Sequence, residues 1–347
     1  MRNRLISSDS AAQDAGNGAL VLGGNAVDAV LAAMLAGAVR GSPSSLLGSA
    51  VITVAGLGVG AYAVDGRARA PGLGMPRMPS PASPPTRDSV AVPGLVEGAL
   101  AAHNRFGSLV LSRVVKAAMD AVKEHEENKD VQLRARLTCL EAVHRHGPQW
   151  MAKTGVAQAL LEAAGLPAKG VLGRDDLEPV AAPVIELKAL AVEHHELLTM
   201  EPDRVAPFAP PTPPATPIGV AIAGDMHGVF ATAAWAIAGE ACILEGEFGL
   251  SGASLNNAPT KGVTRRAPGT RIAMPTPLCL VRTAASVWAA AAVSGEGALD
   301  AGCDALVQGK LLRLAQGAAP RGVRGMSYWL VRETGDELRA SEEALSR

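Results

Sequence analysis

Hydrophobic residues cover nearly every face of residues 25–39, where Ala, Leu, Val and Met predominate. A helix that is apolar all round is buried inside a domain, so this pattern predicts an internal helix packed against a sheet. Two β-rich runs follow at residues 50–55 and 59–64, separated by the turn-like sequence Gly-Leu-Gly. Their composition and spacing predict a hairpin. The first apolar run is too short for a membrane span, which takes roughly 20 residues.

Helical patterning with charges on single faces returns in the middle third, which is therefore predicted to be helical. The predicted helices are residues 95–103, 108–127, 133–146 and 156–164. Two Pro-rich runs, at residues 71–88 and 202–217, cannot sustain a helix or a ladder and are predicted to be loops. The second run separates the helical third from a β-rich final third. Predicted strands there are residues 218–223, 229–235, 278–282 and 326–331, with a helix at 297–314.

Composition narrows the classes of partner. The 32 basic residues nearly cancel the 33 acidic ones, which gives no overall field to attract nucleic acid or an anionic membrane. Four Phe, two Tyr and four Trp are too few for a stacking platform on single-stranded nucleic acid. We therefore expect no nucleic acid and no membrane partner. Small molecules and proteins remain as possible partners. The sequence leaves open whether the chain forms homo- or hetero-oligomers.

The cysteine and histidine spacings indicate no metal or cofactor. The four cysteines are widely separated, contain no CxxC pair and are interpreted as buried, reduced thiols. The close histidine pairs, 144 with 146 and 194 with 195, are read as solvated helix positions that do not face one another. The first sixteen residues lack the apolar run of a secretory signal. We expect a cytoplasmic protein.

Three segments of the first half resemble the gamma-glutamyltranspeptidase family and occur in the family's order. They are GGNAVDAVLAA at residues 23–33, VDGRARAP at 64–71 and SVAVPGLVEGALAAHNRFGSL at 89–109. The second is similar to an Asp-x-Arg-Glu-x-Ala-Pro element, with Ala68 in place of Glu. In the final third, TPIGVAIAGDMHGVFAT resembles the family's nucleophile strand, LNNA its Asn pair and AMPTP its Ser-Ser-Met-Ser-Pro-Thr element.

The resemblance implies an α+β fold, the four-layer αββα sandwich of N-terminal-nucleophile hydrolases. It also implies a division into a large-subunit-like region at residues 1–201, a Pro-rich linker at 202–215 and a small-subunit-like region at 216–347, together one composite domain. A further helical segment of the family's large subunit has no counterpart before residue 202, so the chain resembles a shortened member.

The same resemblance implies a catalytic residue and a carboxylate-binding residue. In the family a precursor cuts itself, and the new N-terminal Thr uses its own α-amine as the general base for its hydroxyl. The alignment puts Thr216 at this position and implies cleavage after Ala215. Arg67 would bind the carboxylate of a γ-glutamyl donor, for which a guanidinium is suited. The alternatives are an ordinary linker residue at Thr216 and a surface arginine at Arg67.

Two further pairs of residues complete the implied site. Asn256 and Asn257 would hydrogen-bond the amino-acid head of the donor, although an Asn pair also shapes turns. Gly295 and Gly297 correspond loosely to the glycines of the family's oxyanion hole.

Substitutions at the donor's binding positions leave three functions open. Thr260 and Lys261 stand where an acidic residue would bind the donor's ammonium, and Ile272 and Ala273 stand where two serines would bind its carboxylate. The first hypothesis is an enzyme that cleaves or transfers a γ-glutamyl or similar acyl group through an N-terminal Thr216 after self-cleavage. The second is a catalytically inactive member that serves as a binding or assembly module. The third is an acylase of related fold whose donor lacks the glutamate head.

Overall fold

The computed structural model describes most of the first two hundred residues and a set of strands after them. Described are residues 4–41, 45–56, 58–74, 90–125, 131–168, 170–192, 195–200, 219–236, 241–244, 250–253, 267–272, 278–283, 288–294, 325–332 and 338–345.

Helices and strands in this part of the chain have the following bounds. The helices are α1 (Ser10–Val21), α2 (Ala26–Arg40), α3 (Leu95–Phe106), α4 (Leu111–Glu124), α5 (Val131–His146), α6 (Trp150–Thr154) and α7 (Val156–Ala164), with short 3-10 turns at Gly147–Gln149, Leu166–Ala168 and Asp175–Leu177. The strands are β1 (Arg4–Ser7), β2 (Ser49–Gly56), β3 (Gly60–Gly66), β4 (Val184–Glu186), β5 (Lys188–Val192), β6 (His195–Thr199), β7 (Gly219–Gly224), β8 (Val229–Ala236), β9 (Ala241–Leu244), β10 (Leu250–Ala253), β11 (Leu278–Thr283), β12 (Trp288–Ser294), β13 (Gly325–Arg332) and β14 (Leu338–Leu345).

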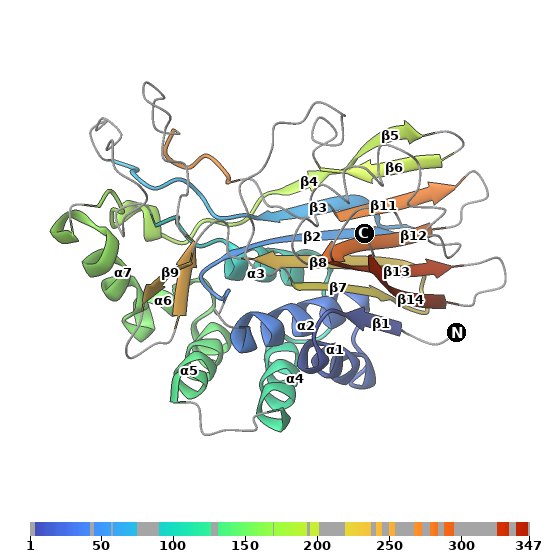
Figure 1. Cartoon of the computed structure of the whole chain (residues 1–347), viewed down its shortest axis with the longest axis horizontal. Coiled ribbons are helices and arrows are strands. Elements are labelled where there is room, and N and C mark those ends of the chain that lie inside the picture. The colour runs from blue at the N-terminus through green and yellow to red at the C-terminus, as the bar shows by residue number, and fades with distance from the viewer. Residues whose placement is uncertain are drawn as a thin grey trace.

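Two antiparallel six-stranded sheets are stacked on one another, as Figure 1 shows. The first has the order β1-β7-β8-β2-β3-β4 and the second the order β14-β13-β12-β11-β6-β5. Strands β11, β12 and β13 pack on β2, β7 and β8. Each sheet contains strands from both sides of the Pro-rich run at residues 202–217. The division of the chain at 201 and 215 stays a prediction.

Helices α1, α2 and α3 cover the outer face of the first sheet, and α4 packs on α1 and α2 (Figure 1). Helix α2 lies against β7 and β8, and α3 lies against β2 and β3. The described residues therefore form an α+β fold in which antiparallel sheets are flanked by helices. The helix predicted at residues 297–314 lies outside the described residues. No described helix is long and apolar enough to cross a membrane.

Helix α2 is the predicted internal helix, and every residue from Ala26 to Val39 is buried. Its N-terminus has a capping box, in which the Asn25 side chain accepts from the Asp28 N–H and the Asp28 carboxylate accepts from the Asn25 N–H. The buried Asp28 Oδ2 also accepts from the N–H and hydroxyl of Ser108 and from the Leu109 N–H. The GGNAVDAVLAA pattern thus encodes a buried helix whose first turn anchors the loop between α3 and α4.

Most predicted elements are confirmed, within a few residues at their ends, but the helical interpretation of the middle third is wrong after residue 180. Strands β4, β5 and β6 lie there, and His195 begins β6 and is not on a helix. Their sequences are rich in Ala, Leu, Glu and Lys, which have helix propensity. Pairing of β4 with β3 and of β6 with β11 overrides that local preference.

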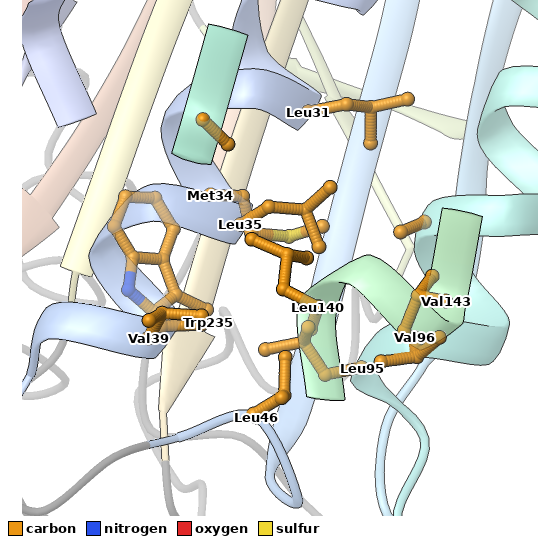
Figure 2. Packing of buried hydrophobic residues seen from close by; sticks show 14 of the residues in the cluster. Leu31, Met34, Leu35, Val39, Leu46, Leu95, Val96, Leu140, Val143 and Trp235 are labelled. Atoms are coloured by element: carbon orange, nitrogen blue, oxygen red, sulfur yellow. The ribbon is translucent and has the colours of Figure 1, made fainter. Parts of the chain in front are cut away.

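Trp235 on β8 joins the helical layer to the first sheet (Figure 2). Its indole packs against two glycines, Gly37 of α2 and Gly219 at the start of β7. A Cβ added at Gly37 would lie 2.4 Å from Trp235 Cζ2, and one added at Gly219 would lie 2.1 Å from Cε2. Both glycines are therefore required by the close approach of a large ring.

Gly37→Ala is expected to overpack this contact and to lower the free energy of unfolding by about 1–3 kcal/mol, measured by urea denaturation. The matched control is Gly18→Ala on α1, where the nearest atom, Ala117 Cβ, would lie at an ordinary 3.7 Å. That control is expected to be neutral or to stabilise, because Ala has the higher helix propensity. Adding Trp235→Phe to Gly37→Ala removes the clash, so the two changes are expected to be non-additive. Equal losses of unfolding free energy in Gly37→Ala and Gly18→Ala would contradict the packing argument.

Cys139 on α5 is 1% exposed, and burial raises the pKa of its thiol to about 11 from an ordinary value of 9.0. At a pH below both pKa values, the fraction of Cys139 present as thiolate is about 100-fold lower in the native protein than in the unfolded chain. The thiolate is the form that reacts. We expect alkylation of Cys139 by iodoacetamide at pH 8.5, followed by peptide mass spectrometry, to be at least that much slower in buffer than in urea. Equal rates would show that α5 does not bury the thiol.

Candidate functional site

Four strands of the first sheet end in one row at the same edge. Gly219 pairs with Trp235, Trp235 pairs with Ala50, and Ala50 pairs with Gly66. Gly219 is the first residue of β7 and Gly66 the last of β3. The chain therefore enters β7 and leaves β3 at one edge of the sheet, three strand spacings or roughly 14 Å apart. We call this edge the rim.

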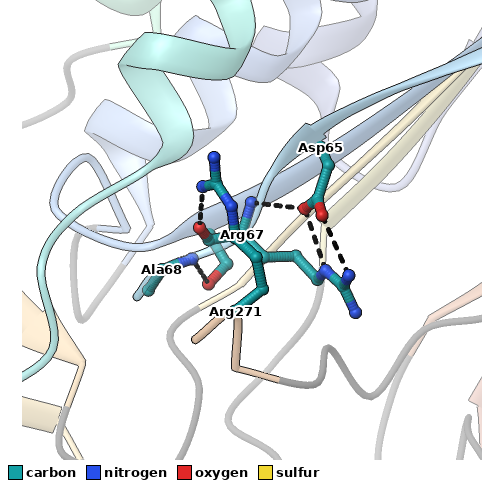
Figure 3. A network of polar contacts seen from close by, with 5 residues as sticks. Asp65, Arg67, Ala68 and Arg271 are labelled. Atoms are coloured by element: carbon teal, nitrogen blue, oxygen red, sulfur yellow. Dashed lines mark hydrogen bonds and ion pairs between the residues drawn. The ribbon is translucent and has the colours of Figure 1, made fainter. Parts of the chain in front are cut away.

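Arg67 leaves β3 at the rim and forms an ion pair with Asp65 (Figure 3). The Arg67 Nε donates to Asp65 Oδ1 at 2.8 Å, and its Nη2 donates to Oδ2 at 2.9 Å. The Arg67 backbone N–H also donates to Oδ1 at 3.1 Å. The two side chains are 12% and 3% exposed, so the surface interpretation of Arg67 is wrong. Two of its guanidinium nitrogens are engaged in a charge-assisted, bidentate pair.

The segment after Arg67 is the middle of a short three-stranded ribbon. Arg69 pairs with Val92 on one side and with Arg271 on the other. The Ala68 N–H donates to Ser49 Oγ at 2.9 Å, and the Ile272 N–H donates to the Ala68 carbonyl at 2.8 Å. Residues from three distant parts of the chain thus fix the backbone around Arg67.

Neither the side chain nor the backbone N–H of Ile272 offers a hydrogen-bonding group to a ligand. Its side chain is apolar and the residue is 7% exposed, while its backbone N–H is used by the Ala68 carbonyl. A packed apolar side chain therefore occupies this position of the ribbon.

A second ion pair lies behind the ribbon. Arg69 Nη2 donates to Glu97 Oε1 at 3.0 Å, and the Arg69 and Glu97 side chains are 7% and 12% exposed. Burial raises the pKa of Glu97, and the charges of Arg69 and Arg271 oppose that rise. Within the described residues, Arg69 Nε and Glu97 Oε2 are buried and have no hydrogen-bond partner by geometry. The pair is thus joined by a single hydrogen bond between two largely buried side chains.

Asp176 fixes the continuation of the chain beyond the ribbon. It is fully buried, and its carboxylate accepts from the backbone N–H groups of Gly72, Leu73 and Gly173 at 2.8, 3.0 and 2.8 Å. The sequence alone predicts no role for this residue. Its role follows only from the fold, because Gly72 lies about a hundred positions earlier.

Of the residues predicted for the site, the structure describes Arg67 and puts it at the rim. The others, Thr216, Asn256, Asn257, Gly295 and Gly297, lie outside the described residues and stay predictions. Within the described ranges no group of three or more His, Cys, Asp or Glu side chains could hold a metal ion. Sequence reasoning missed Asp65 and Arg271. The Asp-x-Arg spacing at the end of a predicted strand was the only signal for the first.

Comparisons with known proteins support the family resemblance in sequence and in fold. Residues 12–125 match the sequence model of Gamma-glutamyltranspeptidase. The crystal structure of cephalosporin acylase from Bacillus halodurans is similar to this chain with a TM-score of 0.72 at 12% identity, over 99% of this chain and 96% of that one. The structure of LmbA2991HD is similar with a TM-score of 0.70 at 13% identity, over the same shares.

A gamma-glutamyltranspeptidase from Helicobacter pylori aligns less completely, with a TM-score of 0.46 and 19% identity over 57% of this chain and 69% of that one. A search of the curated proteins gave no significant match. The family resemblance predicted from the sequence is confirmed: the chain is gamma-glutamyltranspeptidase-like in sequence over residues 12–125, and its α+β fold resembles the acylase structure over nearly its whole length.

Proposed function

We propose that the chain is an amide hydrolase or acyl transferase that cuts itself between Ala215 and Thr216 and then uses Thr216 as its nucleophile. The supporting observation is the rim, where the chain enters β7 and Arg67 leaves β3. Thr216 precedes Gly219 by three residues, so their Cα atoms are separated by at most roughly 11 Å. A small donor with a carboxylate at one end and an amide at the other fits this span between arginine and nucleophile.

In the proposed reaction the Thr216 hydroxyl attacks the donor's amide carbon, and its own α-amine takes the proton. The amine of the donor leaves, and water or a second amine then accepts the acyl group. Asn256 and Asn257 would hold the donor's head, and Gly295 and Gly297 would supply N–H groups to the oxyanion. Each oxyanion donor of this kind contributes about 10²–10³ in rate.

The proposed architecture is the complete four-layer αββα sandwich. The described residues supply one helical layer and both sheets. Residues 297–314, with their helical pattern, would contribute to the layer on the other side of the second sheet.

A second candidate, an acylase whose donor lacks the glutamate ammonium, is favoured by two observations. Lys261 stands where an acidic residue would bind an ammonium, and Ile272 is packed with its N–H engaged. The acylase from Bacillus halodurans has a similar fold over nearly the whole chain. A donor with a carboxylate but no ammonium suits this set of residues, because Lys261 would repel a positive head.

The first test is intact-mass spectrometry of the purified chain after prolonged incubation. We expect two fragments, residues 1–215 and 216–347, whose summed mass exceeds that of the precursor by one water. Thr216→Ala is expected to stay uncut. Thr212→Ala changes the same residue type in the same Pro-rich run and is expected to be cut like the parent. One uncut chain in all samples would refute the nucleophile and leave the binding or assembly module as the function to pursue.

The second test compares two chromogenic donors on the processed protein, γ-glutamyl-p-nitroanilide and glutaryl-p-nitroanilide, which differ only in the ammonium group. Because Lys261 disfavours a positive head, we expect kcat/KM to be at least about tenfold higher for the glutaryl compound. The γ-glutamyl preference is expected to rise in Lys261→Glu. A clear preference of the parent protein for the γ-glutamyl compound would instead assign a γ-glutamyl transferase.

A further inference from the structure

The guanidinium of Arg271 is held in place by a backbone carbonyl and forms no ion pair with a described acidic side chain. Its Nη1 donates to the Arg67 carbonyl at 2.5 Å, and the residue is half-buried. In the described part of the chain, Arg271 forms no ion pair and its side chain donates no other hydrogen bond. Because Arg271 is only half-buried, the residue is not sealed from solvent. Two adjacent donors of a planar fork are therefore available to a ligand.

The charges around Arg271 leave a positive excess. Those that act on it are the carboxylates of Asp65 and Glu97 and the guanidinium groups of Arg69 and Arg67. Among the described residues, three guanidinium groups including Arg271 thus act together with two carboxylates, which leaves an excess of one positive charge. Burial lowers the pKa of Arg271, an effect that Asp65 and Glu97 oppose. An anion beside Arg271 would remove the excess.

The surroundings add further preference for an anion. The Arg67 carbonyl that fixes Arg271 lies against the start of α3, since a Cβ added at Gly94 would be 2.5 Å from it. No side chain caps the N-terminus of α3, where the helix carries partial positive charge. Arg69 is 6% exposed, and its Nε has no hydrogen-bond partner among the residues that the structure describes. Its Nη2 pairs with Glu97 in the first turn of the same helix.

We propose that the Arg271 guanidinium, beside the Arg67 carbonyl and the first turn of α3, binds a small oxyanion, a carboxylate or a phosphate. The planar fork of Arg271 matches two oxygens of either group. Figure 3 shows the guanidinium groups of Arg67 and Arg271 on opposite sides of the Arg67 backbone. The anion site is therefore separate from the Asp65–Arg67 pair and goes beyond the proposed function. An anion bound there would act on the ribbon that carries Arg67, through the Arg271 hydrogen bond.

The experiment measures the thermal unfolding midpoint of the full chain in sodium acetate, sodium phosphate or sodium chloride at one ionic strength. Because a ligand of the native state raises the midpoint, we expect acetate or phosphate to raise Tm above the chloride value. Arg271→Gln is expected to lose at least half of that rise. Arg113→Gln removes the same charge from an exposed position on α4 and is expected to keep all of it. The double variant Asp65→Asn/Arg67→Gln, which removes the neutral ion pair, is also expected to keep the full rise of Tm.

The outcomes separate the two sources and test the site. A rise with acetate alone assigns a carboxylate ligand, and a rise with phosphate alone assigns a phosphate. The proposal is overturned if neither anion raises Tm above the chloride value. It is also overturned if Tm rises as much in Arg271→Gln as in the parent protein. Because Arg271→Gln removes a structural hydrogen bond, Arg271→Lys gives a second measurement. It keeps the charge but loses the fork, and titration calorimetry with acetate or phosphate is expected to show about tenfold weaker binding. Unchanged affinity in that variant would equally refute the site. These measurements do not require cleavage at Thr216, so their failure and that of the proposed function are distinguishable.

Discussion

The burial of α2 on all sides is the constraint from which the arrangement follows. No face of this helix carries enough polar side chains to meet water, so it must be enclosed by other elements. Helices α1, α4 and α5 close one side, and β7 and β8 close the other. The two strands come from a part of the chain almost two hundred residues later. Enclosing α2 therefore brings the start of β7 into the same sheet as β2 and β3, which creates the rim.

Much of the fold could be predicted because its elements have strong local signals. The all-apolar pattern identified α2, the Gly-containing turns identified both hairpins, and one-sided charge identified α3, α4, α5 and α7. Helix α1 was missed because two glycines within SAAQDAGNGALV weaken the helical pattern. The structure gives the reason for one of them: a Cβ at Gly16 would lie 2.3 Å from Leu5 and 2.9 Å from the Ala29 carbonyl. Close packing of α1 against α2 and β1 thus requires a glycine at residue 16, although glycine has a low helix propensity.

The site was less predictable, because its parts meet through pairings of long range. Arg67 could be named from its motif, whereas its engagement by Asp65 depends on the geometry at the end of β3. Arg271 reaches the Arg67 carbonyl across 204 positions of sequence, and no spacing rule reports such a contact. Thr216 and the Asn and Gly pairs rest on alignment alone. These residues lie outside the described part of the chain.

The interleaving of strands has a consequence for what a cut chain would be. In the first sheet, β7 lies between β1 and β8, and β8 in turn pairs with β2; in the second, β6 pairs with β11. A break anywhere between β6 and β7 would therefore yield two polypeptides that share both sheets and one core. Neither could leave without exposing the apolar surface of the other, so the nicked protein would be an obligate heterodimer. Its stability, unlike that of the intact chain, would depend on protein concentration.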